Sequence, residues 1–187
     1  TLESTVDGIL VVDQVGRIQR FNNRFLEMWK ISEEIIQTKN DEQALNFVID
    51  QLRYPNQFIN KVKELYKDTK AESIDILEFK DGRVFERYSR PQLTGNNAVG
   101  RVWSFRDITD RKIAEEALIE SEKKFRSLFE TSIEGILASN ADQKVVLVNP
   151  RMSELTGYSV QELMSMNFTQ LIPPDEMEAH LAKIENK

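Results

Sequence analysis

Few side chains in this chain could do chemistry, and their spacing favours no common catalytic site. His180 is the single histidine and there is no cysteine, so thiol catalysis, disulfides and cysteine zinc sites are excluded. A Ser-His-Asp triad would have to use His180. The 7 glycines are scattered singly, which excludes a glycine-rich phosphate-binding loop. We therefore expect no catalytic residue and no enzyme activity in this segment.

Adjacent acidic residues are the remaining candidates for acid-base or metal chemistry. Most of them fall where helices are predicted to begin or along the helix predicted near the middle of the chain, and a carboxylate at a helix start complements the helix dipole. We interpret them as solvated charges, with acid-base or metal chemistry as the alternative. The pairs are Glu33-Glu34, Asp41-Glu42, Glu115-Glu116 and Asp175-Glu176.

The composition narrows the class of protein. The 187 residues include 25 Lys plus Arg and 31 Asp plus Glu, giving a net charge of −6, and 40% are hydrophobic. The acidic balance argues against nucleic acid or anionic membrane as a partner, because both attract basic surfaces. No apolar run approaches the ~18 residues of a membrane span, and the first residues are not a basic stretch followed by an apolar one, so we expect neither a membrane span nor a signal peptide. We expect a soluble, cytoplasmic protein without a metal.

An internal repeat organises the chain. Residues 5–32 align without a gap over residues 132–159, and both copies have two short apolar runs around a polar turn, followed by residues typical of helix starts. This succession predicts a β-hairpin and two short helices in each copy. The identical pairs are Gly8/Gly135, Ile9/Ile136, Leu10/Leu137, Asn22/Asn149, Arg24/Arg151, Glu27/Glu154 and Ser32/Ser159.

Asparagine and serine mark the predicted helix starts. Asn22 and Asn149 directly follow the two hairpins, and an asparagine oxygen readily accepts a first-turn N–H. Ser159 has capping-box spacing to Glu162, and Ser32 is its counterpart in the first copy. A short helix is therefore expected directly after each hairpin, with a second helix start close behind.

The first copy continues where the second does not. Residues 41–68 have helical spacing of apolar side chains. Three alternating segments then predict antiparallel strands with one covered face, joined by turns at Asp81-Gly82 and at Gly95 to Asn97. The predicted strands are 72–79, 83–93 and 99–108, and the second copy stops before any equivalent of them.

Residues 109–130 contain no Gly or Pro and predict one continuous helix. Apolar and small residues recur along it at steps of 4, 3, 4 and 3, which is heptad-like. Two heptads fall short of a secure coiled coil, so an amphipathic helix lying on its own domain remains the alternative. The residues of this stripe are Ala114, Leu118, Ser121, Phe125 and Leu128.

The chain resembles the PAS sensor family. The segment GRVWSFRDITDRK, Gly100 to Lys112, resembles the last PAS strand running through an Asp-Ile-Thr motif into a signalling helix. The two repeat copies are similar to the openings of two successive PAS domains. The resemblance implies an α+β fold: a five-stranded antiparallel sheet with helices on one face, a long linker helix and a truncated second PAS copy. The corresponding division is 1–108, 109–131 and 132–187.

The resemblance also implies a function. We expect a sensory and signal-relay module of a multidomain bacterial-type signalling protein, such as a sensor histidine kinase or a diguanylate cyclase. Asp107 would pair with Arg111 or Lys112 and hold strand and helix in register. The alternative is that Asp107 or Thr109 caps the helix. The residues expected to carry the relay are Trp103, Asp107, Ile108, Thr109 and Arg111.

No cofactor is expected, although flavin and haem are alternatives. The absence of cysteine excludes flavin-cysteinyl photochemistry, while a non-covalent flavin would use an aromatic such as Trp29, Tyr88 or Trp103. The segment from Leu171 to Ile184 resembles haem-binding oxygen-sensor PAS domains, with His180 at the place of the iron ligand. A haem-based gas or redox sensor that uses His180 is therefore an alternative function. The simpler interpretation of His180 is an exposed histidine on a helix.

The expected partners are a small molecule in the PAS cavity and a second copy of the chain. PAS domains commonly dimerise through flanking helices, so a homodimer through the linker helix is predicted. A module that only dimerises or binds another protein, without a ligand, is the third interpretation. The residues predicted on this dimer helix are Leu118, Phe125, Leu128 and Phe129.

Overall fold

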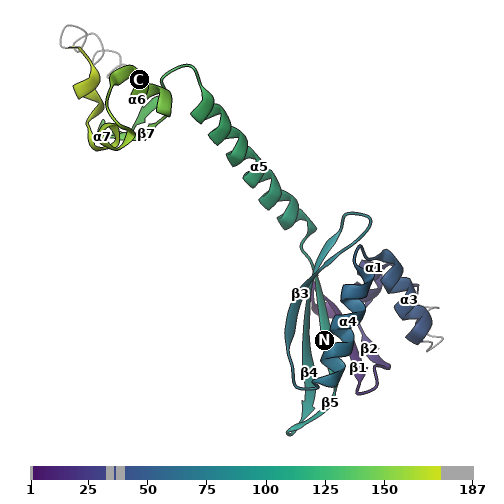
Figure 1. The fold of residues 1–187 in the computed structure, drawn as a ribbon. Coiled ribbons are helices and arrows are strands. Elements are labelled where there is room, and N and C mark those ends of the chain that lie inside the picture. Colours follow the sequence, from purple (N-terminus) through teal and green to yellow (C-terminus); the bar gives the residue numbers. More distant parts are fainter. Residues whose placement is uncertain (1, 33–35, 37–40, 174–187) are drawn as a thin grey trace. The chain divides into compact units, whose positions relative to one another are not determined.

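The computed structural model describes residues 2–32, 36 and 41–173 (Figure 1). The chain divides into two compact units, Thr1–Glu115 and Glu116–Lys187. The predicted helix start after Ser32, the pair Glu33-Glu34, the pair Asp175-Glu176 and His180 concern residues outside the described ones. The three-part division at residues 108 and 131 stays a prediction.

The first unit is an α+β domain with a five-stranded antiparallel sheet, which confirms the predicted fold class. The strand order is β2-β1-β5-β4-β3. Helices α1, α3 and α4 lie on one face of the sheet (Figure 1). The strands are β1 Gly8–Asp13, β2 Ile18–Phe21, β3 Ser73–Glu78, β4 Val84–Thr94 and β5 Asn97–Asp107, and the helices are α1 Asn23–Trp29, α3 Asp41–Gln51 and α4 Pro55–Lys67.

The core lies between the sheet and these helices, around the indole of Trp29. This side chain is 1% exposed. Its ring centre lies 5.1 Å from that of Phe79 and 5.2 Å from that of Phe105. Aromatic pairs at such separations add to the free energy gained from burial alone. Trp29 ends α1, so the aromatic cluster fixes this helix against the sheet.

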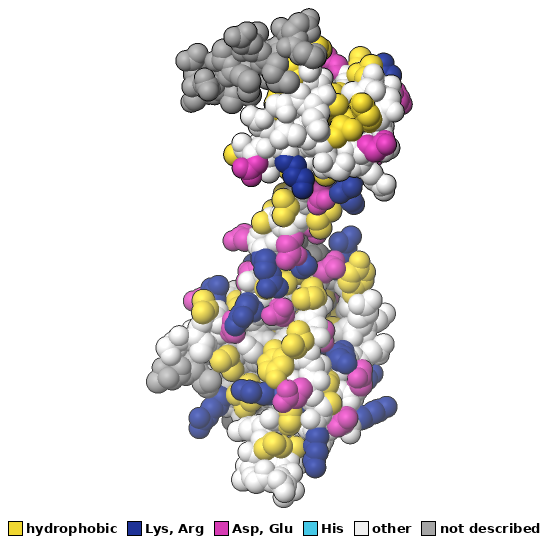
Figure 2. Space-filling view, turned by 90° about the vertical axis from the view of Figure 1, so that its left-hand side faces the viewer, with side chains coloured by type: hydrophobic (Ala, Val, Ile, Leu, Met, Phe, Trp, Pro, Cys, Tyr) yellow, Lys and Arg dark blue, Asp and Glu magenta, His cyan; other side chains and the backbone are white. Residues whose placement is uncertain are grey.

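The opposite face of the sheet is more polar. Ile74 and Ile76 on the edge strand β3 are 67% and 47% exposed, while the neighbouring positions of β4 and β5 carry Glu86 and Arg106. Figure 2 shows apolar side chains scattered among acidic and basic ones on this side of the molecule. No broad basic surface appears in this view.

Helix α5 spans Thr109–Thr131, where the sequence predicts one continuous helix. It contains no buried residue. Within the part of the chain that the structure describes, no helix combines the length and apolarity needed to span a bilayer.

The second unit contains a two-stranded sheet and short helices. Its small core consists of Val145, Val148 and Leu163. The Ser159 hydroxyl and the Glu162 side chain form the predicted capping box. The elements are β6 Leu137–Ser139, β7 Val145–Val148, α6 Pro150–Thr156, α7 Val160–Ser165 and a 3-10 turn at Phe168–Leu171.

Two asparagines at equivalent places in the repeat make the same contacts. The Asn22 oxygen accepts the backbone N–H of Ile9 at 2.8 Å and that of Phe25 at 3.0 Å, and its amide donates to the Asp7 carbonyl at 2.9 Å. The Asn149 side chain repeats this with Ile136, Met152 and Glu134 at the same three distances. Both asparagines are fully buried. Each therefore caps a helix and fastens it to the preceding hairpin.

Replacing Asn22 tests this role. We expect Asn22→Ala to lower the free energy of unfolding of the first unit by about 2–4 kcal/mol, because a cap is lost and buried backbone groups lose their partners. Urea denaturation measures the change. The exposed neighbour variant Asn23→Ala is the control and should stay within about 0.5 kcal/mol of the unchanged chain. Equal effects of the two variants would contradict the assigned role.

Candidate functional site

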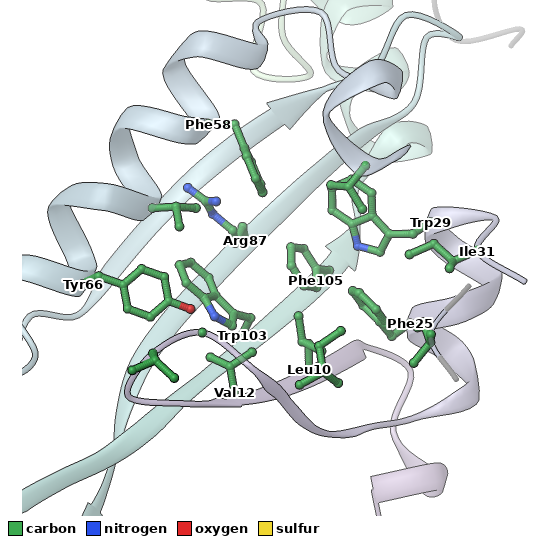
Figure 3. A pocket seen from close by; sticks show the side chains of 16 residues that line it. Leu10, Val12, Phe25, Trp29, Ile31, Phe58, Tyr66, Arg87, Trp103 and Phe105 are labelled. Atoms are coloured by element: carbon green, nitrogen blue, oxygen red, sulfur yellow. The ribbon is translucent and has the colours of Figure 1, made fainter. Parts of the chain in front are cut away.

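A cavity of about 330 Å³ lies in the first unit between the helix-bearing face of the sheet and α1, α3 and α4 (Figure 3). Its wall is mostly apolar and strongly aromatic. Among the side chains that line it are Leu10, Trp29, Phe58, Tyr66, Trp103 and Phe105. Such a concave, apolar space with a few polar groups is the usual form of a small-molecule site.

Arg87 is the charged side chain in this wall. It lies on the helix-covered face of β4 and is 1% exposed. Its Nε donates to the Asp75 carboxylate on β3 at 2.7 Å, and its Nη2 donates to the other oxygen. The guanidinium carbon lies 4.7 Å from the ring centre of Phe58 and 5.0 Å from that of Trp103. The ion pair and the two rings fix the arginine head at the cavity.

Two buried N–H groups at this cavity have no hydrogen-bond partner among the described residues. They are Nη1 of Arg87 and Nε1 of Trp29. A buried donor without an acceptor costs about 1–3 kcal/mol, and most buried polar atoms in proteins are therefore paired. Both side chains line the cavity, and Arg87 also lines a neighbouring cavity of about 230 Å³ together with Asp75. A ligand oxygen within hydrogen-bond reach of either N–H group would satisfy it.

A second buried arginine, Arg101, has a structural role. Its Nη2 donates to the Leu65 carbonyl at 2.9 Å and to the Asp68 carbonyl at 3.2 Å, at the end of α4. Its Nη1 donates to the Ala71 carbonyl and to the Ser89 hydroxyl. Burial lowers the pKa of this guanidinium from its ordinary value. Arg101 thus fastens the end of α4 to β4 and β5, and so sets one wall of the cavity.

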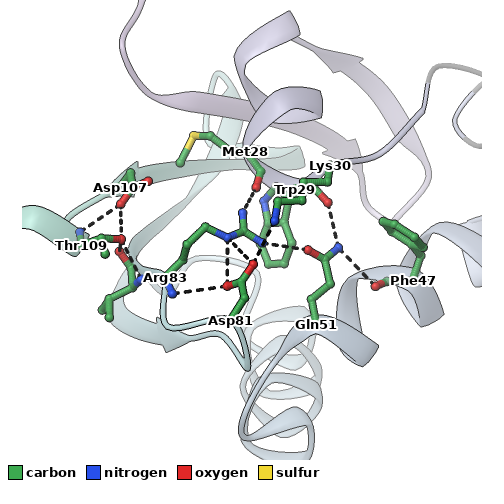
Figure 4. A network of polar contacts seen from close by, with 10 residues as sticks. Met28, Trp29, Lys30, Phe47, Gln51, Asp81, Arg83, Asp107 and Thr109 are labelled. Atoms are coloured by element: carbon green, nitrogen blue, oxygen red, sulfur yellow. Dashed lines mark hydrogen bonds and ion pairs between the residues drawn. The ribbon is translucent and has the colours of Figure 1, made fainter.

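Arg83, at the entry to β4, connects the sheet to the end of α1 (Figure 4). Its Nη1 donates to the Met28 carbonyl, and its Nη2 donates to the Gln51 side chain at 3.0 Å. Gln51 in turn donates to the Trp29 carbonyl at 2.8 Å. Nε of Arg83 pairs with Asp81 at 2.9 Å. The backbone of the two residues that end α1, one of them the cavity residue Trp29, is therefore held by the turn before β4.

The start of α5 is hydrogen-bonded to Val84, the first residue of β4. The backbone N–H of Val84 donates to the Thr109 hydroxyl at 3.0 Å, and the N–H of Ile108 donates to the Val84 carbonyl at 2.9 Å. The Asp107 carboxylate accepts the Thr109 backbone N–H at 2.9 Å and also its hydroxyl. Ile108 is 4% exposed. Asp107 therefore caps the first turn of the helix, as the sequence alternative that Asp107 or Thr109 caps it allows, while the Thr109 hydroxyl joins the helix start to β4.

The alternative pairing of Asp107 with a basic side chain does not occur among the described contacts. Arg111 pairs with Glu86 on β4 at 3.4 Å, and Lys112 pairs with Glu115 at 2.8 Å. The prediction that Arg111 or Lys112 binds Asp107 is corrected accordingly. The reason is geometric, since the Asp107 carboxylate already turns back onto the first helical N–H group, which lies nearer.

The other predicted site residues separate into distinct places. Trp29 and Trp103 line the cavity, whereas the Tyr88 hydroxyl donates to Glu72 at 2.6 Å, a bond that raises the pKa of Tyr88. His180 lies outside the described residues, and among those described no group of three or more His, Cys, Asp or Glu could hold a metal ion. On α5, Leu118, Phe125 and Leu128 are exposed and Phe129 is half-buried.

Comparisons with known proteins agree with this architecture. The sequence profile of the PAS fold matches residues 2–116, and a second PAS-fold profile matches residues 123–187. The chain belongs to the PAS family. PAS sensor domains are generally non-catalytic, which is in keeping with the lack of a catalytic motif in the sequence.

Two curated relatives of this PAS chain are kinases by name. Sporulation kinase E of Bacillus subtilis (strain 168) is 21% identical over 183 residues, which is 94% of this chain and 23% of that protein. The sensor histidine kinase TmoS of Ectopseudomonas mendocina is 31% identical over 71 residues, which is 36% of this chain and 7% of that protein. The chain thus spans about a quarter or less of each relative. These relatives support a sensory role in signal transduction.

Two solved structures are similar to part of the chain. The sensor region of a sensor histidine kinase matches with a TM-score of 0.45 and 15% identity, over 57% of this chain and 41% of that one. The PAS domain from Bordetella pertussis BvgS matches with a TM-score of 0.45 and 17% identity, over 66% of this chain and 92% of that one.

Sequence reasoning missed the polar part of the PAS cavity. The alternation of β4 places Arg87 between Phe85 and Ser89 on the covered face, and an arginine at such a position signals a buried guanidinium. Its partner Asp75 occupies the opposite position on β3. This signal could be found only after the pairing of the two strands is known.

The Arg87-Asp75 pair gives a measurable prediction. We expect Asp75→Ala to lower the free energy of unfolding by about 1–3 kcal/mol, because it leaves the Arg87 guanidinium buried without its acceptor. Urea denaturation measures it. The matched control is Glu78→Ala on the same strand, whose partner Arg53 is 64% exposed. Its effect should stay below about 0.5 kcal/mol, and an equally small effect of Asp75→Ala would contradict a buried pair.

Proposed function

We propose that the first PAS unit is the input part of a sensor histidine kinase type of protein, and that it passes a change at its cavity to helix α5. The observation that carries this proposal is the position of Arg83 and Val84. Arg83 holds the carbonyl of Met28, next to the cavity residue Trp29, while Val84 holds Ile108 and Thr109 at the start of α5. Two residues adjacent in the chain, Arg83 just before β4 and Val84 at its start, therefore contact the end of α1 beside the cavity and the start of the output helix.

The same contacts describe how a displacement would pass from the cavity to α5. A ligand that displaces the Trp29 ring moves the end of α1, and the Met28 carbonyl moves with it. Arg83 then transmits the displacement to the start of β4, since its guanidinium carbon lies 4.4 Å from the Phe79 ring centre and the side chain has little freedom. Helix α5 responds because hydrogen bonds of Val84 hold its first turn. A ligand can shift this equilibrium only as far as it favours one arrangement of the wall.

Hydrogen exchange on the 187-residue chain tests the relay. We expect Arg83→Met, which keeps an unbranched stem but removes the donors, to speed exchange of the Val84, Ile108 and Lys112 amides by about tenfold. The amides of β1 should change by less than about twofold. Arg90→Met, an exposed arginine on the same strand, is the control. Uniform acceleration across the unit, or none at the three amides, would count against a relay through Arg83.

A second candidate function is self-association through α5. Leu118, Phe125 and Leu128 are 70%, 57% and 64% exposed, and they share one heptad-like stripe. A second copy of the chain would present the same stripe, so the two surfaces are complementary by symmetry. The rings of Phe125 and Phe129 stack at 5.6 Å and would add a flat apolar surface to it. Exposed apolar side chains grouped in this way mark association surfaces.

Size-exclusion chromatography with light scattering tests this association. We expect the unchanged chain to have about twice the mass of one 21.7 kDa chain at micromolar concentration, and Leu118→Glu to shift it toward one chain, since a buried charge at the stripe is costly. Lys124→Glu, on the same helix but outside the stripe, should leave the mass unchanged. A single-chain mass for the unchanged protein would refute the dimer.

A further inference from the structure

The cavity of the first unit carries enough chemistry to define the class of its ligand, an inference that rests on the proposed sensory function. Its volume of about 330 Å³ is about twice that of an engineered cavity of about 150 Å³ that holds benzene. The space therefore suits a molecule of one ring with a side group, or two fused rings.

The wall favours a flat aromatic molecule. Trp29, Trp103, Phe58 and Phe105 line the cavity, and Figure 3 shows these rings around the central space. Aromatic rings pack well against one another in edge-on or offset arrangements. The space is also apolar enough that transfer of an aromatic ring from water is favourable.

The two unpaired donors require more than an apolar ligand. Nη1 of Arg87 and Nε1 of Trp29 are buried without a partner among the described residues, and both side chains belong to the cavity wall. A purely apolar ligand would leave both unpaired and would also exclude the water that could reach them. A ligand with an acceptor oxygen restores one or both hydrogen bonds.

The charges at the wall favour an uncharged ligand. The positive charge of Arg87 is already paired with Asp75 through two hydrogen bonds, so a carboxylate on the ligand would be buried close to a second carboxylate. The nearby guanidinium of Arg101 has four protein oxygens as acceptors. A neutral carbonyl or hydroxyl accepts from Arg87 without this repulsion and without the desolvation cost of a charge.

We infer that the cavity of the first PAS unit binds a small, uncharged aromatic molecule whose carbonyl or hydroxyl oxygen accepts a hydrogen bond from Arg87 Nη1 or Trp29 Nε1. The ring occupies the space among the aromatic side chains. The oxygen sets its orientation. A change in the position of Trp29 then reports occupancy to the end of α1.

Three probes of nearly the same shape test the inference. Acetophenone is neutral and has an acceptor oxygen, α-methylstyrene replaces that oxygen with a methylene group, and benzoate carries a full negative charge. Binding is followed by the fluorescence of the two tryptophans, both of which line the cavity, and by calorimetry. We expect acetophenone to bind about tenfold tighter than α-methylstyrene, as one satisfied hydrogen bond to a buried donor allows, and tighter than benzoate.

Two variants separate the donors. Trp29→Phe keeps an aromatic ring but removes Nε1, and the double variant Asp75→Leu with Arg87→Met removes the ion pair without leaving an unpaired charge. At least one of them should abolish the preference for acetophenone while changing the affinity for α-methylstyrene by less than about threefold. Tyr88→Phe, whose hydroxyl bonds Glu72 instead, is the control and should keep the preference.

Each other outcome overturns a stated part of the inference. Equal affinity for acetophenone and α-methylstyrene refutes the acceptor, tighter binding of benzoate refutes the uncharged ligand, and no binding of any probe refutes the ligand class. The relay is judged separately, by exchange of the Ile108 and Lys112 amides on addition of acetophenone. If acetophenone binds and these amides do not respond, the ligand class stands and the proposed relay fails.

Discussion

A single residue, Ile108, separates strand β5 from helix α5, and much of the first unit depends on this junction. Because no loop intervenes, the direction of the helix is set where the strand ends. Ile108 is buried, its N–H is bonded to the Val84 carbonyl, and Thr109 accepts from Val84 N–H. The start of α5 is thus hydrogen-bonded to β4, next to the place where β4 pairs with β5. A displacement of β4 by a fraction of a residue must either break these bonds or move the first turn of α5 with it.

The cavity adds a second constraint to the same strand. On its covered face, β4 presents Phe85, Arg87 and Ser89 in succession. Phe85 belongs to the apolar core, Arg87 forms the buried ion pair with Asp75, and the Ser89 hydroxyl accepts a hydrogen bond from Arg101. Burying Arg87 is costly unless its hydrogen bonds are satisfied, and Asp75 satisfies those of Nε and Nη2. A residue that served packing alone would not need a charge here, since an aliphatic side chain of the same volume would avoid the desolvation cost. The charge of Arg87 is better explained by a hydrogen bond that its Nη1 donates to a ligand.

The sequence predicts the elements well and the site poorly, for a physical reason. Alternation fixes the strands to within two residues, asparagine caps fix the first helix of each repeat, and the lack of Gly and Pro fixes α5. These signals are local, and they act through the backbone. The cavity, in contrast, is made by β1, β2, β4, β5, α1, α3 and α4 together. The Arg87-Asp75 pair joins two strands, and the contact of Arg83 with the Met28 carbonyl spans 55 residues. Resemblance to a family pointed to Asp107 and Thr109. Only the geometry shows that Asp107 accepts the Thr109 N–H and that Arg111 forms an ion pair with Glu86.

The repeat indicates how one helix can serve a PAS unit at each of its ends. In the first copy the amide of Asn22 donates to the Thr5 hydroxyl at 3.1 Å; in the second, the amide of Asn149 donates at 3.1 Å to the carbonyl of Phe129. That carbonyl is one of the last four of α5, which have no partner within the helix. A side chain that caps α6 therefore also satisfies the end of α5. Since α5 buries none of its own residues, contacts at its two ends hold it: Val84 and Asp107 at Thr109, and Asn149 at Phe129. The exposed Leu118 and Phe125 lie between these two anchors and contribute to neither.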